Sequence, residues 1–226
     1  YQKLVADFQS MVEQGAHTVA IEYASPGGMA HGCFEAAMAM REMADANGVQ
    51  IVAYIDEMAA SAAYALASVS DIIIANPMAK VGSIGVVVSL YNELPKKIKE
   101  GAEAIFVYSG DSKVPYDSEG KLRQDFINSI QEDTDALYVQ FIRHVAEYRP
   151  MTEDEIRDTQ AKMFRTGDAQ VKGLIDREMT SAEFIEYLAT LSEKKQEKKS
   201  MSLFPWGKKD RQMSQEEPEV SLEEPS

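Results

Sequence analysis

Short apolar segments alternate with helical segments along the first half of this chain. The spacing of apolar residues predicts helices over residues 2–14, 29–46 and 62–69. Runs of apolar and β-branched residues predict strands over residues 17–23, 49–55, 71–75, 84–90 and 103–108. Because a helix between two strands normally makes a right-handed crossover, this alternation predicts an α/β fold with a largely parallel sheet.

The second half of the chain is predominantly helical in pattern. Phe126, Ile130 and Leu137 belong to an apolar stripe that predicts a long helix over residues 122–148. Thr152 and Glu155 have the spacing of a capping box, which indicates the start of a short helix. Further helices are expected over residues 167–172 and 181–191.

We expect one folded domain over residues 1–192 and a disordered tail over residues 193–226. The domain has a normal size for a single hydrophobic core. The tail combines a run of charge with a stretch rich in Glu and Pro, a composition typical of disordered chains. It contains one apolar island, residues 203–206, for which an incidental cluster is favoured over a short docking motif.

Composition excludes several classes of function. The formal net charge of -14 leaves no basic surface for nucleic acid, so no nucleic-acid partner is expected. The single cysteine, Cys33, cannot form a disulfide within the chain, which fits a reducing compartment. No run approaches the roughly 18 apolar residues of a membrane span, and no signal peptide is visible. The sequence opens on Tyr1 rather than Met, so removal of an N-terminal anchor stays open.

Ser61 stands where the predicted strand 49–55 leads into a helix of small residues beginning at Ala62. The N–H groups at a helix N-terminus stabilise negative charge, as an oxyanion in acyl transfer requires. The alternative is a structural role, because serine is also a preferred N-cap residue.

A serine nucleophile needs a base, and the sequence offers few. The three histidines, His17, His31 and His144, fit structural or solvent-facing positions better. Lys113 follows a predicted strand in a loop that can fold onto the site, and a buried lysine can act as a base when it is neutral. The alternative is an ordinary solvated lysine.

A glycine pair, Gly27 and Gly28, follows the first predicted strand and precedes a helix. Glycines allow a backbone to approach a ligand closely, although a tight turn alone also explains them. The chain lacks the glycine patterns of nucleotide-binding loops and the ligand spacing of zinc sites. We therefore expect no cofactor and no metal.

Four short motifs occur in a characteristic order: Ser-Pro-Gly-Gly at 25–28, Met-Ala-Ala-Ser-Ala-Ala-Tyr at 58–64, Gly-Ser-Ile-Gly at 82–85 and Ser-Gly-x-x-Lys at 109–113. Together they resemble the signal peptide peptidase A family, which includes the phage protein C type of head-maturation protease. The resemblance covers roughly residues 1–190. It implies a fold similar to Clp protease and crotonase, built from repeated β-β-α and βαβ units with a helical C-terminal part, and assembly into rings.

The resemblance also implies roles for individual residues. Ser61 corresponds to the nucleophile, Lys113 to the general base, and Ser83 to a serine that orients the lysine. The implied oxyanion hole is formed by backbone N–H groups at Gly27, Gly28 and Ala62. The chain departs from the family pattern in having Ala62 and Ala63 where Gly-Gly is common, and in lacking the strand that normally precedes the first helix.

The implied activity is that of a serine endopeptidase that acts through a Ser/Lys dyad and an acyl-enzyme. The expected partners are peptide or protein substrates, copies of the same chain in a ring, and capsid or scaffold proteins. Processing of such proteins in a phage prohead is favoured. The alternatives are a bacterial signal peptide peptidase, in the cytoplasm or associated with the membrane through a removed anchor, and a non-catalytic crotonase-like module for binding or assembly.

Overall fold

The computed structural model describes the backbone of residues 1–203 and the side chains of residues 1–192. The chain divides into two compact units, Tyr1–Phe184 and Ile185–Ser226. The first unit contains the whole sheet and all the predicted site residues. No helix within residues 1–203 is long and apolar enough to cross a membrane.

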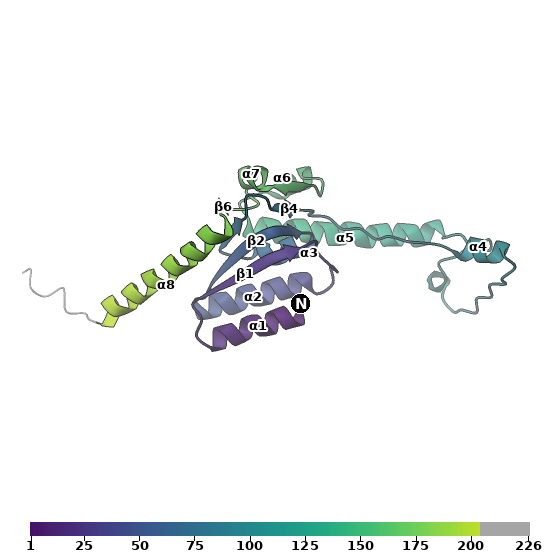
Figure 1. Cartoon of the computed structure of the whole chain (residues 1–226). Coiled ribbons are helices and arrows are strands. Elements are labelled where there is room, and N and C mark those ends of the chain that lie inside the picture. Colours follow the sequence, from purple (N-terminus) through teal and green to yellow (C-terminus); the bar gives the residue numbers. More distant parts are fainter. Residues whose placement is uncertain (204–226) are drawn as a thin grey trace, which may run out of the picture. The chain divides into compact units, whose positions relative to one another are not determined.

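The first unit is built on a six-stranded, mostly parallel sheet (Figure 1). Strand β2 is central. It pairs in parallel with β1 along one edge, and with β3 and then β4 along the other. β6 is parallel to β3, whereas β5 is antiparallel to β4. The strands are β1 (Thr18–Ser25), β2 (Gln50–Ala60), β3 (Ile72–Ala75), β4 (Lys80–Gly82), β5 (Met163–Arg165) and β6 (Arg177–Glu178). The predicted mixed α/β fold with a largely parallel sheet is confirmed.

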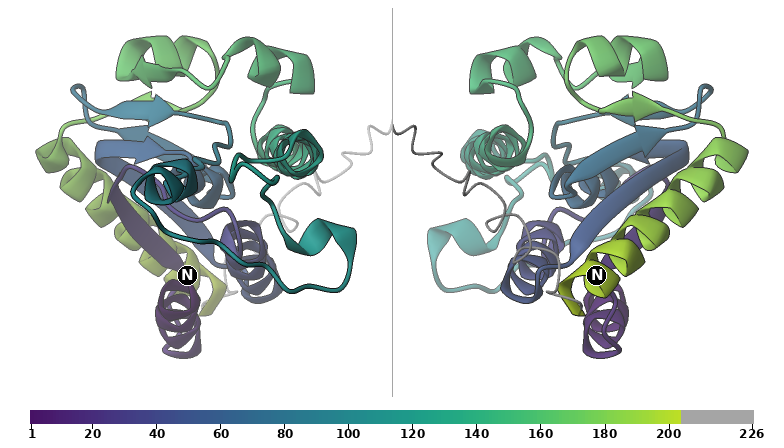
Figure 2. Two further views of the ribbon diagram at one scale, coloured as in Figure 1. Left: turned by 90° about the vertical axis from the view of Figure 1, so that its right-hand side faces the viewer. Right: turned by 90° about the vertical axis from the view of Figure 1, so that its left-hand side faces the viewer.

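Helices cover the sheet in two groups. α1 packs on α2, α2 on α3, and α3 on α5, whereas α7 contacts β4, β5 and β6. In both views of Figure 2, the α1–α2 pair and the α6–α7 pair lie at opposite ends of the sheet. The helices of the two groups are α1 (Gln2–Glu13), α2 (Cys33–Asn47), α3 (Ala62–Ser68), α5 (Gln124–Tyr148), α6 (Glu153–Asp158) and α7 (Thr166–Val171).

The core lies where β2 meets α2 and α3. Ile51 and Ile55 of β2 and Met40 of α2 are completely buried. All seven residues of α3 are buried, and four of them are alanine. The small alanine side chains let this short helix lie close to the sheet and to its neighbouring helices.

Two predicted strands are wrong. Residues 84–90 and 103–108 are not part of any strand and have no regular secondary structure. Ile105 and Val107 are exposed, so the apolar pattern there does not reflect burial within this chain. The sheet instead gains β4, which begins four residues before the first of these segments. A strand of three residues carries too little pattern to be predicted, and its pairing with β2 is set by the fold.

Other boundaries shift by a few residues. α2 begins at Cys33 rather than at residue 29, because Gly32 in the left-handed region forms its N-cap. The capping box is confirmed: the Thr152 hydroxyl accepts from the Glu155 N–H, and the Glu155 carboxylate accepts from the Thr152 N–H. α8 (Ser181–Leu203) continues past residue 192, where we ended the domain. Residues 204–226 of the predicted tail lie outside the described residues, and the domain boundary stays a prediction.

Residues 86–123 form a projecting segment that we call the arm. It includes α4 (Leu94–Lys99) and the short 3-10 helix η1 (Asp111–Lys113). Figure 1 shows α4 at the end of α5 that points away from the sheet. The buried residues of α5 are Phe141, Ile142, His144 and Val145, so its first half carries the arm without packing on the core.

Candidate active site

The motifs predicted to form the site follow the carboxyl ends of three neighbouring parallel strands. Gly27 and Gly28 follow β1, Ser61 follows β2, and Ser83 follows β4. Because β1 and β4 flank the end of β2, all three turns meet at one edge of the sheet. Ligand sites of open α/β sheets form at this edge.

Ser61 occupies the turn between β2 and α3 in an unusual conformation. Its φ is 52° and its ψ is -124°, a combination that a residue with a side chain rarely adopts and that costs about 1–3 kcal/mol. The Ser61 N–H donates to the Gly82 carbonyl at 2.9 Å, and the Ser61 carbonyl accepts from the N–H groups of Tyr64 and Ala65. The backbone is therefore held on both sides of the residue.

The Ser61 hydroxyl makes no capping hydrogen bond to the first turn of α3. Ser61 is the N-cap residue of α3 by position, but the side-chain hydrogen bond expected of a structural cap is not formed. Ser61 also lines a groove of about 690 Å³. The groove is also lined by Pro26, Gly28, Met29, Ala30, Cys33, Phe34, Ala62, Ser83, Gly85, Val86, Val87, Gln131, Thr134, Asp135, Tyr138, Phe141, Gln160 and Ala161.

Backbone strain concentrates in this groove. Among the described residues, the non-glycine residues with positive φ are Ser61, Ser83, Gln160 and Ala161, and all four line it. Strained backbone of this kind persists only where the surrounding structure enforces it, and it clusters at functional sites. The groove is therefore the strongest candidate for an active site.

Gly27 packs directly against the Ser61 turn. A β-carbon on residue 27 would lie 2.7 Å from the Ala60 carbonyl oxygen and 2.8 Å from the Ser61 β-carbon. Its φ of 108° is a further reason for glycine. The structure thus brings the glycine pair, Ser61 and Ala62 together, as the sequence predicts for a nucleophile beside backbone N–H groups.

The turn after β4 and the segment after α6 meet at the other side of the groove. The Ser83 N–H donates to the Lys162 carbonyl at 3.0 Å. A β-carbon on Gly85 would lie 2.6 Å from that of Ala161. Gln160 and Ala161 were missed by the sequence analysis, because neither residue type nor spacing marks a left-handed conformation at these positions.

Lys113 lies elsewhere in the single chain. It ends η1 on the arm, is exposed, and is not among the residues that line the groove. No lysine or arginine is found among the described lining residues, where Asp135 is the one charged side chain. The groove of one chain therefore holds the predicted nucleophile and Ser83, but not the predicted base.

The histidines and the cysteine are poor candidates for the chemistry. His17 and His31 are exposed and lie outside the groove lining. His144 is buried, and its Nε2 donates to the Ala65 carbonyl at 2.9 Å, which makes it structural. Cys33 lines the groove, but burial raises the pKa of its thiol to about 11, so the nucleophilic thiolate is scarce at neutral pH.

Comparison with known proteins identifies the family of this chain. The sequence model of peptidase family S49 matches residues 43–195, which includes Ser61, Ser83 and Lys113. The chain belongs to peptidase family S49. This confirms the resemblance to the signal peptide peptidase A and phage protein C proteins, and it supports a protease.

Several curated relatives carry protease names. Capsid assembly protease C of Escherichia phage lambda is 29% identical over 167 residues, covering 74% of this chain and 38% of the relative. Head-tail preconnector protein GP5 of Enterobacteria phage P21 is 28% identical over 191 residues, covering 84% of this chain and 38% of that protein. A probable protease SohB of Haemophilus influenzae is 30% identical over 135 residues, covering 58% of this chain and 38% of that protein. The matched part is thus well under half of each relative.

Proposed function

We propose that this member of peptidase family S49 is a serine endopeptidase whose nucleophile is Ser61. The observation that carries the proposal is the state of this residue: it is strained, its hydroxyl does not cap α3, and it lines the groove. A side chain held in this way is ready to react without first giving up a structural hydrogen bond. We further propose that the fold is that of the Clp protease and crotonase proteins.

In the proposed reaction, neutral Lys113 takes the proton of the Ser61 hydroxyl as its oxygen attacks the scissile carbonyl. Backbone N–H groups at Gly28 and Ala62, with Gly27 shaping the turn, stabilise the oxyanion. Lys113 then gives the proton to the leaving amine and activates the water that hydrolyses the acyl-enzyme. Ser83, which shares the groove with Ser61, orients the lysine.

We propose that assembly of several copies supplies the base. Lys113 stands on the arm, which exposes large apolar side chains such as Val87, Tyr91 and Val107. Burying apolar surface is favourable by roughly 25 cal/mol per Å², so a second copy that covers the arm stabilises an oligomer. Burial also favours the neutral form of a lysine, which a general base requires. The same contact would then build the site and activate its base.

The names of the two phage relatives favour a setting in phage assembly. They are a capsid assembly protease and a head-tail preconnector protein. We propose that the substrates are capsid or scaffold proteins processed in a prohead. The SohB relatives favour the alternative of a bacterial peptidase, and cleavage of phage structural proteins distinguishes the two.

The proposal is tested with the single variants Ser61→Ala and Lys113→Ala on an unfolded peptide substrate. Both should lose at least about a thousandfold in turnover, because each removes a group that acts directly on the reacting atoms. A fluorophosphonate probe should label the unmodified protein on Ser61 alone. Near-native turnover of either variant would contradict the dyad, and failure of labelling would favour the non-catalytic module.

A further inference from the structure

The strained conformation of Ser61 depends on how firmly the next helix is held. α3 is a short helix of small, buried side chains. Such side chains pack closely but offer few directional contacts that fix the rotation or height of a helix. A polar anchor in its first turn would therefore set the position of Ser61.

Tyr64 is that anchor. Its backbone N–H donates to the Ser61 carbonyl at 2.8 Å, and its side-chain hydroxyl donates to the Leu174 carbonyl at 2.8 Å. Tyr64 is completely buried, so water does not compete for either bond. Tyr64 thus ties Ser61 to Leu174, which lies 110 positions after Tyr64 along the chain.

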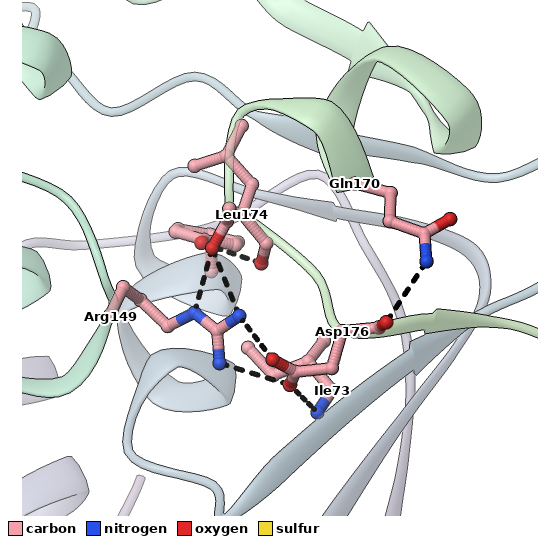
Figure 3. A network of polar contacts seen from close by, with 7 residues as sticks. Ile73, Arg149, Gln170, Leu174 and Asp176 are labelled. Carbon is pink, nitrogen blue, oxygen red and sulfur yellow. Dashed lines mark hydrogen bonds and ion pairs between the residues drawn. The ribbon is translucent and has the colours of Figure 1, made fainter.

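The acceptor segment is itself held rigidly (Figure 3). Arg149, whose side chain is 3% exposed, donates twice to the Gly173 carbonyl and twice to the Asp176 carboxylate. The carboxylate of Asp176 also accepts from the Ile73 N–H at 2.7 Å. Leu174 lies between these two anchored residues, so its carbonyl presents a fixed point to Tyr64.

We infer that Tyr64 and Arg149 are positioning residues for Ser61. Arg149 fixes the segment 173–176 against β3, and the Tyr64 hydroxyl transmits that position to the first turn of α3. Without the hydroxyl, the first turn of α3 loses its link to Leu174 and is held only by the remaining backbone hydrogen bonds and packing, so Ser61 can relax toward a less strained backbone with its hydroxyl displaced. This inference rests on the proposed function of Ser61.

A second tyrosine provides a matched control. Tyr54 of β2 is also buried, and its hydroxyl donates to the Met179 carbonyl at 3.3 Å and lies 3.2 Å from the Ser181 hydroxyl. It therefore ties the C-terminal part of the first unit to the sheet in a similar way. However, Tyr54 precedes Ser61 by seven residues, and the partners of its hydroxyl are Met179, Ser181 and Asn76, which all lie outside α3.

The test compares Tyr64→Phe with Tyr54→Phe, which both keep the ring and remove one hydroxyl. The Tyr64→Phe variant should react with a fluorophosphonate at least about tenfold more slowly at saturating probe, with unchanged probe affinity, because small displacements of a nucleophile lower the rate strongly. On a peptide substrate kcat should fall while KM stays constant. Tyr54→Phe should keep the wild-type rates.

Equal labelling rates for Tyr64→Phe and the unmodified protein would overturn the inference while leaving the proposed function intact. An equal loss of labelling rate in Tyr64→Phe and Tyr54→Phe would also overturn the inference, since it would indicate general destabilisation. If the unmodified protein is not labelled, the proposed function fails as well. If Tyr64→Phe does not fold, Arg149→Lys is tested in its place. It should also slow fluorophosphonate labelling of Ser61.

Discussion

Gly27 and Ser61 are packed so closely that no side chain fits between them: a β-carbon on residue 27 would lie 2.8 Å from that of Ser61. Gly27→Ala should therefore lower peptidase activity at least about a hundredfold, because the Ser61 turn must move to admit the methyl group. Activity and the unfolding temperature should be measured together.

Gly15→Ala is the control for this variant. Gly15 also has positive φ, but nothing lies within 4 Å of its missing β-carbon. Both substitutions carry about 1 kcal/mol or more of backbone strain, and only the one at residue 27 adds a clash. Equal activity of the two variants would show that the close approach to Ser61 is unimportant.

Assembly through the arm predicts that two inactive variants complement each other. If one copy supplies Ser61 and its neighbour supplies Lys113, an equal mixture of Ser61→Ala and Lys113→Ala contains about a quarter of its sites intact. The mixture, after dissociation and reassembly, should regain a comparable share of wild-type turnover. No recovery would indicate that both residues of a site come from the same chain.

The exposed apolar side chains of the arm should drive that assembly. Val107 is 96% exposed in the single chain, and we expect a neighbouring copy to bury it. Val107→Asp should therefore shift the protein toward monomer in light scattering, because a charged side chain opposes that burial. Val171 of α7 is 90% exposed and lies outside the arm, so Val171→Asp should leave the mass unchanged. Loss of assembly in both variants would argue against a specific role for the arm.

The sequence predicted the site wherever local pattern determines it. The glycine pair and Ser61 were singled out because each follows a predicted strand, whereas Ser83 was named only through the family resemblance, since β4 before it was not predicted. Lys113 does not line the groove, and the apolar run before it is exposed rather than part of the sheet. An apolar pattern cannot distinguish burial in a sheet from burial against another chain.

Other parts of the site depend on contacts between distant segments. Asp135 and Tyr138 line the groove only because α5 crosses beside α3, and Ala161 does so only because the loop after α6 returns to β4. The positions of Tyr64 and Leu174 are likewise far apart in the sequence. No local signal marks such pairs, so they become visible only in the folded chain.

Stability should fall as the pH drops from 7 toward 5, because burial lowers the pKa of His144 in the folded protein. The unfolded chain then binds a proton at higher pH than the folded one. The stability contributed by neutral His144 is therefore complete above about pH 6.5 and is lost as the pH falls below it. The free energy of unfolding then changes by up to about 1.4 kcal/mol per pH unit.

His144→Gln keeps a donor for the Ala65 carbonyl but does not titrate, so it should flatten the dependence of unfolding free energy on pH in that range. His31→Gln is the control for the substitution itself, because His31 is exposed. Chemical denaturation at a series of pH values measures both. An unchanged slope in His144→Gln would assign the pH dependence to other groups.

Two arginines close together in the chain should differ sharply in their contribution to stability. The Arg149 side chain is 3% exposed and pairs with Asp176 at 2.9 Å, so Arg149→Met should lower the free energy of unfolding by about 3 kcal/mol, since it removes the cation paired with Asp176 and both side-chain donors to the Gly173 carbonyl. The Arg143 side chain is 70% exposed and lies 3.8 Å from Glu153, so Arg143→Met should cost less than about 1 kcal/mol. Urea denaturation of both variants measures the difference. Similar losses would mean that the network around Arg149 does not fix the segment that receives the Tyr64 hydrogen bond.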